Sequence, residues 1–189
     1  NRWTVSYEDI AQADALLLVG TQVTAANPIV GLNVKEAVKK HGAALLTIET
    51  LVPSIETTSN ITNLSAQHVA VTPGRHAAAV RGLVKAVFDE NLVEAALGTH
   101  AGDFVSGVRA AATALPYPEG LDETALRAIA KTFAGARRGV ILVGQDLLQA
   151  PGGHDAAVNL LDFLLLTGKL TQPGWGLAPL TEENNEQGA

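Results

Sequence analysis

Residues 15–30, with the sequence ALLLVGTQVTAANPIV, place an unbroken apolar run before a glycine, a polar loop and an Asn-Pro pair. A short apolar run that ends at a glycine such as Gly20 is typical of a strand buried on both faces of a parallel sheet. Pro28 suits the first position of a helix, and apolar residues recur at helical spacing from there to Gly42. The stretch therefore predicts a strand, a turn and a helix, the layout of a nucleotide-binding βα turn. Its loop holds one glycine, however, whereas loops that bind phosphate usually hold several.

The rest of the chain also alternates apolar strands with amphipathic helices. Strands are expected at residues 15–20, 43–49, 66–71 and 137–144, and helices at residues 7–13, 28–42, 76–91, 103–115, 123–136 and 156–168. Ser6 with Asp9, and Asp122, are expected to cap two of these helices. Gly42 is expected to end a third. Strands that alternate with helices of this length predict a three-layer α/β/α fold around a mostly parallel, Rossmann-like sheet.

Length and composition bear on the domain organisation. The chain has 189 residues, of which 47% are hydrophobic and 17% charged, and these values describe one globular domain. It begins without Met and ends in NNEQGA, so we interpret residues 1–189 as a single α/β domain from a longer chain. Residues 169–189 are rich in glycine and proline, and we expect an ordered loop there that leads into a neighbouring domain.

Charge and residue types exclude several classes of function. A net charge of -6, without any basic run, argues against a nucleic-acid-binding surface. The absence of Cys excludes disulfides, Cys-ligated zinc and an iron–sulfur cluster held by this segment alone. The histidines form no H-x-x-x-H or H-x-E pair, so no metal site is expected. No apolar run reaches the roughly 18 residues of a membrane span, so no direct membrane insertion is expected.

Three turns that follow expected strands hold the candidate binding residues, because open parallel sheets bind ligands at the carboxyl ends of their strands. Gly20 permits a sharp bend, after which backbone N–H groups could face an anion. Glu49 ends the second strand, where nucleotide-binding folds often place a carboxylate for a ribose or a base. Pro73 and Gly74 predict a type II turn, and Arg75 beside them could contact a phosphate. The alternatives are a plain βα turn, an acid that faces water, and a solvated arginine.

Several segments follow one another in a distinctive order. A strand-glycine unit and an Asn-Pro helix precede KEAVKKHGAALLTIE, VTPGRHAAAVRGLVKAVFDENLVE, ILVG, LLLTGKLTQPGWGLAPL and NNEQGA. In this order and spacing, which extend over essentially all of residues 1–189, the chain resembles the central α/β domain of the molybdopterin oxidoreductases. That superfamily includes formate dehydrogenases, periplasmic nitrate reductases and the large iron–sulfur subunit of bacterial complex I. The resemblance implies an α/β domain that, in catalytic members, binds one of two molybdopterin guanine dinucleotides.

The resemblance also implies which turns would contact that cofactor. Catalytic members typically show Gly-x-Asn-Pro after the first strand, Asp-Pro-Arg after the second and Pro-Gly-Thr-Asp before the next helix. The corresponding segments here are Gly20-Thr21-Gln22-Val23, Glu49-Thr50-Leu51 and Pro73-Gly74-Arg75-His76. The implied cofactor-binding positions are Gly20, Thr21, Gln22, Glu49, Thr50, Pro73, Gly74 and Arg75. No catalytic residue and no metal ligand is expected.

Three altered turns in an intact framework suggest that the fold was kept while cofactor binding relaxed, since each lost hydrogen bond costs about 1 kcal/mol. The resemblance is then greatest to the large iron–sulfur subunit of bacterial complex I, an NADH-quinone oxidoreductase. In that subunit the domain would have a structural and assembly role, with no cofactor and no redox centre in this segment. Its partners would be the remaining domains of the parent subunit and other respiratory-complex subunits. It would be cytoplasmic and peripheral to the inner membrane.

Two alternatives remain open. The first is a domain that binds molybdopterin guanine dinucleotide in a formate dehydrogenase or related molybdenum oxidoreductase, and the intact motif NNEQGA favours it. The second is a generic nucleotide-binding domain, such as the central domain of thiamine-diphosphate enzymes. A Cys or selenocysteine ligand to molybdenum in the flanking chain would support the first alternative over the complex I interpretation.

Overall fold

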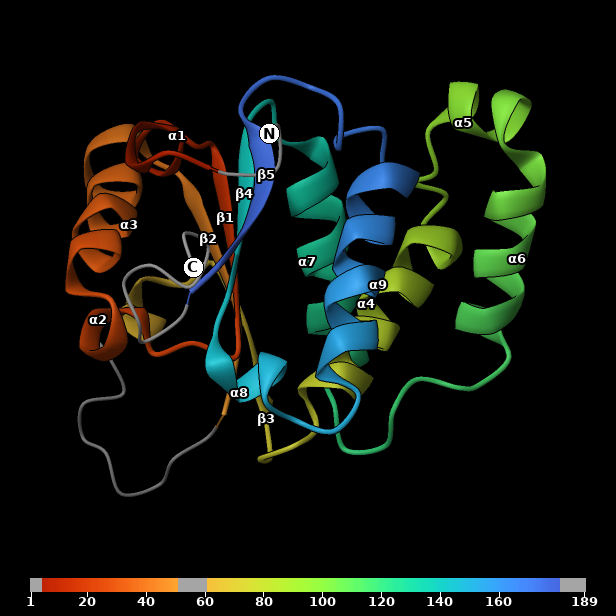
Figure 1. Cartoon of the computed structure of the whole chain (residues 1–189), viewed down its shortest axis with the longest axis horizontal. Helices are drawn as coiled ribbons and strands as arrows, with labels where there is room; N and C mark the ends of the chain where they lie inside the picture. Colours follow the sequence, from red (N-terminus) through yellow and green to blue (C-terminus); the bar gives the residue numbers. More distant parts are fainter. Residues whose placement is uncertain (1–4, 51–60, 181–189) are drawn as a thin grey trace, which may run out of the picture.

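A parallel sheet organises residues 5–50 and 61–180, the part of the chain that the computed structural model describes (Figure 1). Its strands are β1 (Ala15–Val19), β2 (Ala44–Thr50), β3 (Gln67–Val71), β4 (Gly139–Val143) and β5 (Trp175–Pro179). They lie in the order β3-β2-β1-β4-β5, and every neighbouring pair is parallel. In the central strand β1, Leu17 pairs with Leu46 of β2 on one side and with Ile141 of β4 on the other. The expected α/β class with a parallel sheet is confirmed.

Helices cover both faces of the sheet and so make three layers (Figure 1). The described residues form α1 (Tyr7–Ala11), α2 (Val23–Ala26), α3 (Pro28–His41), α4 (His76–Asp89), α5 (Ala95–His100), α6 (Gly102–Thr113), α7 (Glu123–Gly135), α8 (Gln145–Leu148) and α9 (Gly153–Leu166), with a 3-10 turn η1 (Thr62–Leu64). Helices α1, α2 and α3 lie on one face, whereas α4, α7 and α9 lie on the other (Figure 1). Helices α5 and α6 form an outer group beyond α4 (Figure 1).

Local sequence signals set several helix ends. The Ser6 hydroxyl accepts the N–H of Asp9 at 3.1 Å, and the Asp9 carboxylate accepts the N–H of Ser6 at 3.0 Å. This is the expected capping box at the start of α1. Asp122 caps α7 by accepting the N–H of Ala125 at 3.0 Å. Gly42 ends α3 with a φ of 71°, a left-handed conformation that glycine adopts at little steric cost.

Side chains that alternate along β1 divide the core between the two faces of the sheet. Leu17 and Val19 belong to the core under α4, α7 and α9, and Leu16 and Leu18 belong to the core under α1 and α3. All four side chains are fully buried. Burial on both faces explains why this segment is apolar at every position instead of at every second one.

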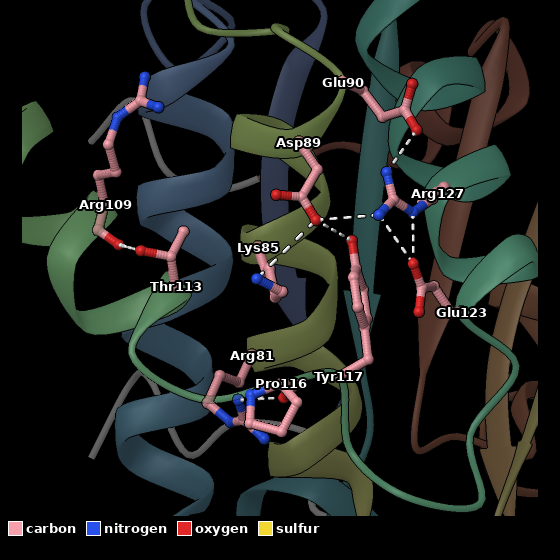
Figure 2. Close-up of polar contacts among 10 residues, drawn as sticks. All are labelled: Arg81, Lys85, Asp89, Glu90, Arg109, Thr113, Pro116, Tyr117, Glu123 and Arg127. Atoms are coloured by element: carbon pink, nitrogen blue, oxygen red, sulfur yellow. Dashed lines mark hydrogen bonds and ion pairs between the residues drawn. The ribbon is translucent and has the colours of Figure 1, made fainter.

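A cluster of ion pairs joins α4 to α7 near the molecular surface (Figure 2). The Arg127 guanidinium on α7 lies 3.1 Å from the Asp89 carboxylate and 2.9 Å from the Glu90 carboxylate. It also lies 2.7 Å from the carboxylate of Glu123, one turn away on its own helix. The hydroxyl of Tyr117 donates to Asp89 at 3.0 Å, and burial together with this hydrogen bond raises the pKa of Tyr117 above its usual value. The cluster therefore fastens the loop before α7 onto the end of α4.

The end of the chain departs from the expectation of a loop over residues 169–189. Strand β5 pairs with β4, and Trp175 lies opposite Gly139. The Trp175 ring covers Gly139, where a side chain would collide with it, and meets the ring of Phe133 edge-on at a centroid distance of 5.2 Å. Because β5 is an edge strand that contains glycine and proline, its sequence pattern resembles that of a loop. Residues 181–189, which include NNEQGA, lie outside the described residues.

Other departures concern short elements. Helices α2, α5 and α8 were not expected, because each has only four to six residues and so shows no clear helical period. Helix α9 begins at Gly153, three positions before the expected start. Residues 51–60, between the strands expected at residues 43–49 and 66–71, lie outside the described residues. Among the helices that are described, none combines the length and the apolar content needed to cross a membrane.

Candidate functional site

The strand order creates a switch point at the carboxyl edge of the sheet. From β1 the chain moves to β2 and β3 on one side, and it returns to β4 on the other side of β1. The connection after β1 leads to α2 and α3 on one face, whereas the connection after β4 leads to α8 and α9 (Figure 1). Neighbouring strands whose connections part in this way leave a crevice between them, and open α/β sheets bind their ligands there.

A cleft of about 410 Å³ occupies this crevice. Its lining consists of Gly20, Thr21, Gln22, Ala25, Ala26, Asn27, Gln145, Asp146, Gln149 and Leu180. One wall follows β1 and the other follows β4, so segments far apart in the sequence meet at the cleft. Its volume lies in the range of small-molecule sites, about 300–1,000 Å³.

Gly20 lines the floor of the cleft at the end of β1, and Gly144, at the end of β4, packs against it. Gly20 has a φ of 61°, and its carbonyl accepts the N–H of Asp146 at 3.2 Å. The N–H of Gly144 donates to the carbonyl of Val19 at 2.9 Å. A Cβ on Gly144 would collide with the Gly20 carbonyl, and a Cβ on Gly20 would lie 2.7 Å from the backbone nitrogen of Leu147. Glycine at both positions therefore allows the two backbone segments to pack directly against each other.

The polar side chains on the cleft walls are four amides, one carboxylate and the hydroxyl of Thr21. The amides belong to Gln22, Asn27, Gln145 and Gln149, and the carboxylate to Asp146. No lysine or arginine is among the described residues that line the cleft. Within residues 5–50 and 61–180, no group of three His, Cys, Asp or Glu side chains could hold a metal ion. The walls suit a neutral group that both donates and accepts hydrogen bonds, such as a nucleoside, better than a multiply charged phosphate.

The first turn supplies the candidate residues that reach the cleft. Gly20, Thr21 and Gln22 all line it. The opposite wall was not predicted from the sequence, although the strand-glycine ending of residues 137–144 gave a signal for it. Because β1 and β4 pair in register, Gln145 follows β4 at the position that Thr21 has after β1. The sequence alone does not show that β1 and β4 are neighbours, so it does not place the residues after β4 at the cleft.

The second turn sends its two candidate residues to opposite faces of the sheet, because side chains alternate along a strand. Glu49 lies on the face of α3, where it is 8% exposed and accepts a hydrogen bond from the Thr62 hydroxyl at 2.7 Å. Burial raises the pKa of Glu49 above its ordinary value, and the hydrogen bond from Thr62 partly offsets this rise. Glu49 is not among the described residues that line the cleft, so a role in holding a ribose there is not supported.

Thr50 lies on the other face and contacts the cleft indirectly. Its hydroxyl donates to Oδ2 of Asp146 at 3.1 Å and lies 3.3 Å from Nε2 of His76. His76 is the first residue of α4 and is fully buried. Neither partner was predicted from the sequence to be a site residue. Asp146 is 96 positions from Thr50, and no local pattern links the two.

The third turn lies away from the cleft. The N–H of Arg75 donates to the carbonyl of Thr72 at 3.0 Å, and Gly74 has a φ of 80°, so the expected type II turn at Pro73 and Gly74 is present. The turn follows β3, an edge strand that β2 separates from β1. The Arg75 guanidinium donates to the carbonyl of Glu119 at 2.7 Å. The described lining of the cleft includes none of the three candidates in this turn.

The chain is similar to known proteins along its whole length. Residues 1–189 match the family described as Molybdopterin oxidoreductase. The assimilatory nitrate reductase catalytic subunit of Bacillus subtilis is 26% identical over 186 residues, which cover 96% of this chain and 25% of that protein. The F420-dependent formate dehydrogenase subunit alpha of Methanocaldococcus jannaschii is 26% identical over 192 residues, which cover 98% of this chain and 27% of that protein. The chain thus spans about a quarter of the length of these curated relatives.

A solved structure shares the fold. Acetylene hydratase from Pelobacter acetylenicus has a TM-score of 0.71 and 17% sequence identity, and the match covers 87% of this chain and 23% of that one. At this identity the likeness shows the fold alone. The resemblance to the superfamily that the sequence predicted is confirmed. The assignment to complex I finds no support in these relatives, which are a nitrate reductase and a formate dehydrogenase.

Proposed function

Because the chain belongs to the molybdopterin oxidoreductase family, we propose that it is the domain that binds the guanosine end of a molybdopterin guanine dinucleotide. The parent protein would be a molybdenum oxidoreductase of the nitrate reductase or formate dehydrogenase type. The named relatives support this assignment. The observation that carries the proposal is the polar cleft at the β1/β4 switch point.

The residues at the cleft fit a nucleoside. Gly20 lines the cleft and lets the turn after β1 pack directly against α8, which brings the two polar walls together. Gln149 donates from Nε2 to Oε1 of Gln145 at 3.1 Å, and these two amides together with Gln22 keep further donors and acceptors of the kind that a base edge and ribose hydroxyls require. A cleft of about 410 Å³ has room for a group of that size.

On this proposal the chain binds and orients the cofactor. When the cofactor is bound, the molybdenum carried by its pterin supplies the oxidation–reduction chemistry. The cleft residues would hold the nucleotide end of the cofactor and so would orient the rest of it. The remaining domains of the parent subunit would be the partners of this domain and would surround the metal.

The complex I interpretation depends on three altered turns, and the positions of Glu49 and Arg75 in two of them weaken it. Glu49 and Arg75, in the second and third turns, lie outside the described lining of the cleft. Their departures from the family pattern therefore carry little information about nucleotide binding at the switch point. In the first turn, Gln22 stands at the position of the Asn in the family pattern. Both side chains end in an amide, so the capacity to donate and accept hydrogen bonds is kept.

A matched pair of tryptophan substitutions in the parent protein tests the proposal. Ala25 lines the cleft on α2, and Ala111 is exposed on α6 outside the cleft. Ala25→Trp fills the cleft, and we expect it to lower the guanine nucleotide released by acid from the purified protein by about tenfold, because a bulky side chain excludes the ligand. Ala111→Trp should leave the nucleotide content unchanged. Equal nucleotide content in both variants would contradict the proposal.

A further inference from the structure

Three residues from separate elements form a chain of hydrogen bonds that ends at the cleft. Thr50, the last residue of β2, donates its hydroxyl hydrogen to Oδ2 of Asp146 at 3.1 Å. The same hydroxyl oxygen lies 3.3 Å from Nε2 of His76, at the start of α4. Asp146 belongs to α8 and is part of the cleft lining, so the chain of contacts links β2 and α4 to a residue of the cleft wall.

The direction of these hydrogen bonds follows from counting protons. A threonine hydroxyl has one hydrogen, and the carboxylate of Asp146 can only accept, so the hydrogen of Thr50 points to Asp146. The Thr50 oxygen must then accept from His76, and Nε2 of His76 therefore carries a hydrogen. The sequence of donors runs from His76 through Thr50 to Asp146.

The environment of His76 keeps this direction fixed. The side chain is 0% exposed, and its Nδ1 has no hydrogen-bond partner among the described residues. Burial lowers the pKa of His76 below its ordinary value, and the charge of Asp146 partly offsets that change. The ring is therefore neutral at pH 7, with its single hydrogen on Nε2.

We propose that His76 and Thr50 are positioning residues that hold the Asp146 carboxylate toward the cleft, where it selects a nucleobase with paired N–H donors. The donor from Thr50 occupies one lone pair of Oδ2 and leaves the other lone pairs of the carboxylate for a ligand. Guanine offers adjacent N–H groups on its N1 and 2-amino positions, which match two carboxylate oxygens. This inference rests on the proposed function, because it specifies which part of the nucleotide the cleft recognises.

The test compares GMP with IMP, which lacks only the 2-amino group of guanine. Calorimetric titration of the chain with each nucleotide gives a preference ratio, the Kd for IMP divided by the Kd for GMP. A hydrogen bond to a charged group is strong enough to give wild-type protein a ratio of about ten or more. Asp146→Asn replaces an acceptor oxygen with a donor, and we expect the ratio to fall to about one.

Variants at Thr50 and His76 separate positioning from folding. Thr50→Val removes the hydroxyl at nearly constant shape, and we expect a loss of most of the GMP preference, with a smaller rise in the Kd for IMP, which keeps N1–H. Thr50→Ser keeps the hydroxyl and should keep the preference. His76→Gln retains an N–H donor near the position of Nε2 and should also keep the preference, whereas His76→Leu should lose it.

The outcomes distinguish this inference from the proposed function. Equal binding of GMP and IMP to the wild-type chain would overturn the role of Asp146 but leave a nucleoside site at the cleft. A full GMP preference in Thr50→Val would overturn the positioning role of Thr50 and His76. If neither nucleotide binds to the wild-type chain, both the inference and the proposed function fail.

Discussion

Substitution of Gly20 by alanine tests the packing that forms the cleft floor. Gly20 has a φ of 61°, and a Cβ there would lie 2.7 Å from the backbone nitrogen and 3.2 Å from the Cβ of Leu147. The nearest atom belongs to the backbone of α8, which cannot move aside as the end of a flexible side chain can. Gly20→Ala should therefore combine backbone strain with a steric clash between the two walls of the cleft.

Gly42 is a matched control for the loss of stability expected in Gly20→Ala. Gly42 has a φ of 71°, and a Cβ there would meet no atom within 4 Å, so Gly42→Ala introduces only the strain of the left-handed backbone. That strain is about 1–2 kcal/mol, reduced slightly by the lower entropy of the unfolded alanine chain. Overpacking adds about 1–3 kcal/mol at Gly20. We expect Gly42→Ala to lower the free energy of unfolding by about 1 kcal/mol and Gly20→Ala to lower it by about 2–4 kcal/mol.

Urea denaturation followed by circular dichroism measures both losses, and the difference between the two variants isolates the steric contribution. The same two variants should differ in GMP binding, because only Gly20→Ala shifts the cleft floor. Equal losses of stability in the two variants would refute the close approach of β1 and α8 on which the geometry of the cleft depends.

Three further predictions concern the frame around the cleft. Trp175→Ala should lower the free energy of unfolding by about 3–5 kcal/mol, because it removes the edge contact with Phe133. A loss below about 1 kcal/mol in urea denaturation would mean that β5 does not pack as described. Burial raises the folded-state pKa of Glu49 above the unfolded value of 4.5, so the stability from its bound proton is full below that value and is lost as pH rises through the folded pKa. In wild-type protein the free energy of unfolding should therefore fall as the pH rises above 4.5, and Glu49→Gln should reduce this fall. An unchanged pH dependence in urea titrations would contradict the burial of this carboxyl. Tyr117→Phe removes the hydrogen bond to Asp89 (Figure 2) and should cost about 1 kcal/mol by urea denaturation, whereas no loss would show that this contact does not stabilise the helical layer.

Most of the longer helices and the buried strands were predictable because their signals are local. The apolar run before Gly20, the proline at the start of α3 and the glycine at its end act within a few residues, so their outcome depends little on distant packing. Strand β5 was missed because its stability comes from the Trp175 ring over Gly139, a contact between residues that no sequence period relates. Secondary structure was therefore clearest where the segment itself carried the pattern.

The sequence predicted the cleft residues of only one wall, the one that follows β1. The turn after β1 was identified from the strand-glycine pattern, and Gly20 does line the cleft. Asp146 was missed because its importance arises from the pairing of β4 with β1 and from the hydroxyl of Thr50. Glu49 was selected because it ends a strand, but the alternation of side chains turns it to the opposite face from Thr50. A shift of one position along a strand decides which face a side chain occupies.

The central claim is that the switch-point cleft binds the guanosine end of the cofactor, and amide chemical-shift mapping tests it most directly. Titration of the isotope-labelled chain with GMP should shift the backbone amides of Gly20, Thr21 and Gln145, which line the cleft. The amides of Gly74 and Arg75, in the turn after β3, should stay unchanged. Shifts confined to that third turn, or no shifts at millimolar GMP, would contradict the claim.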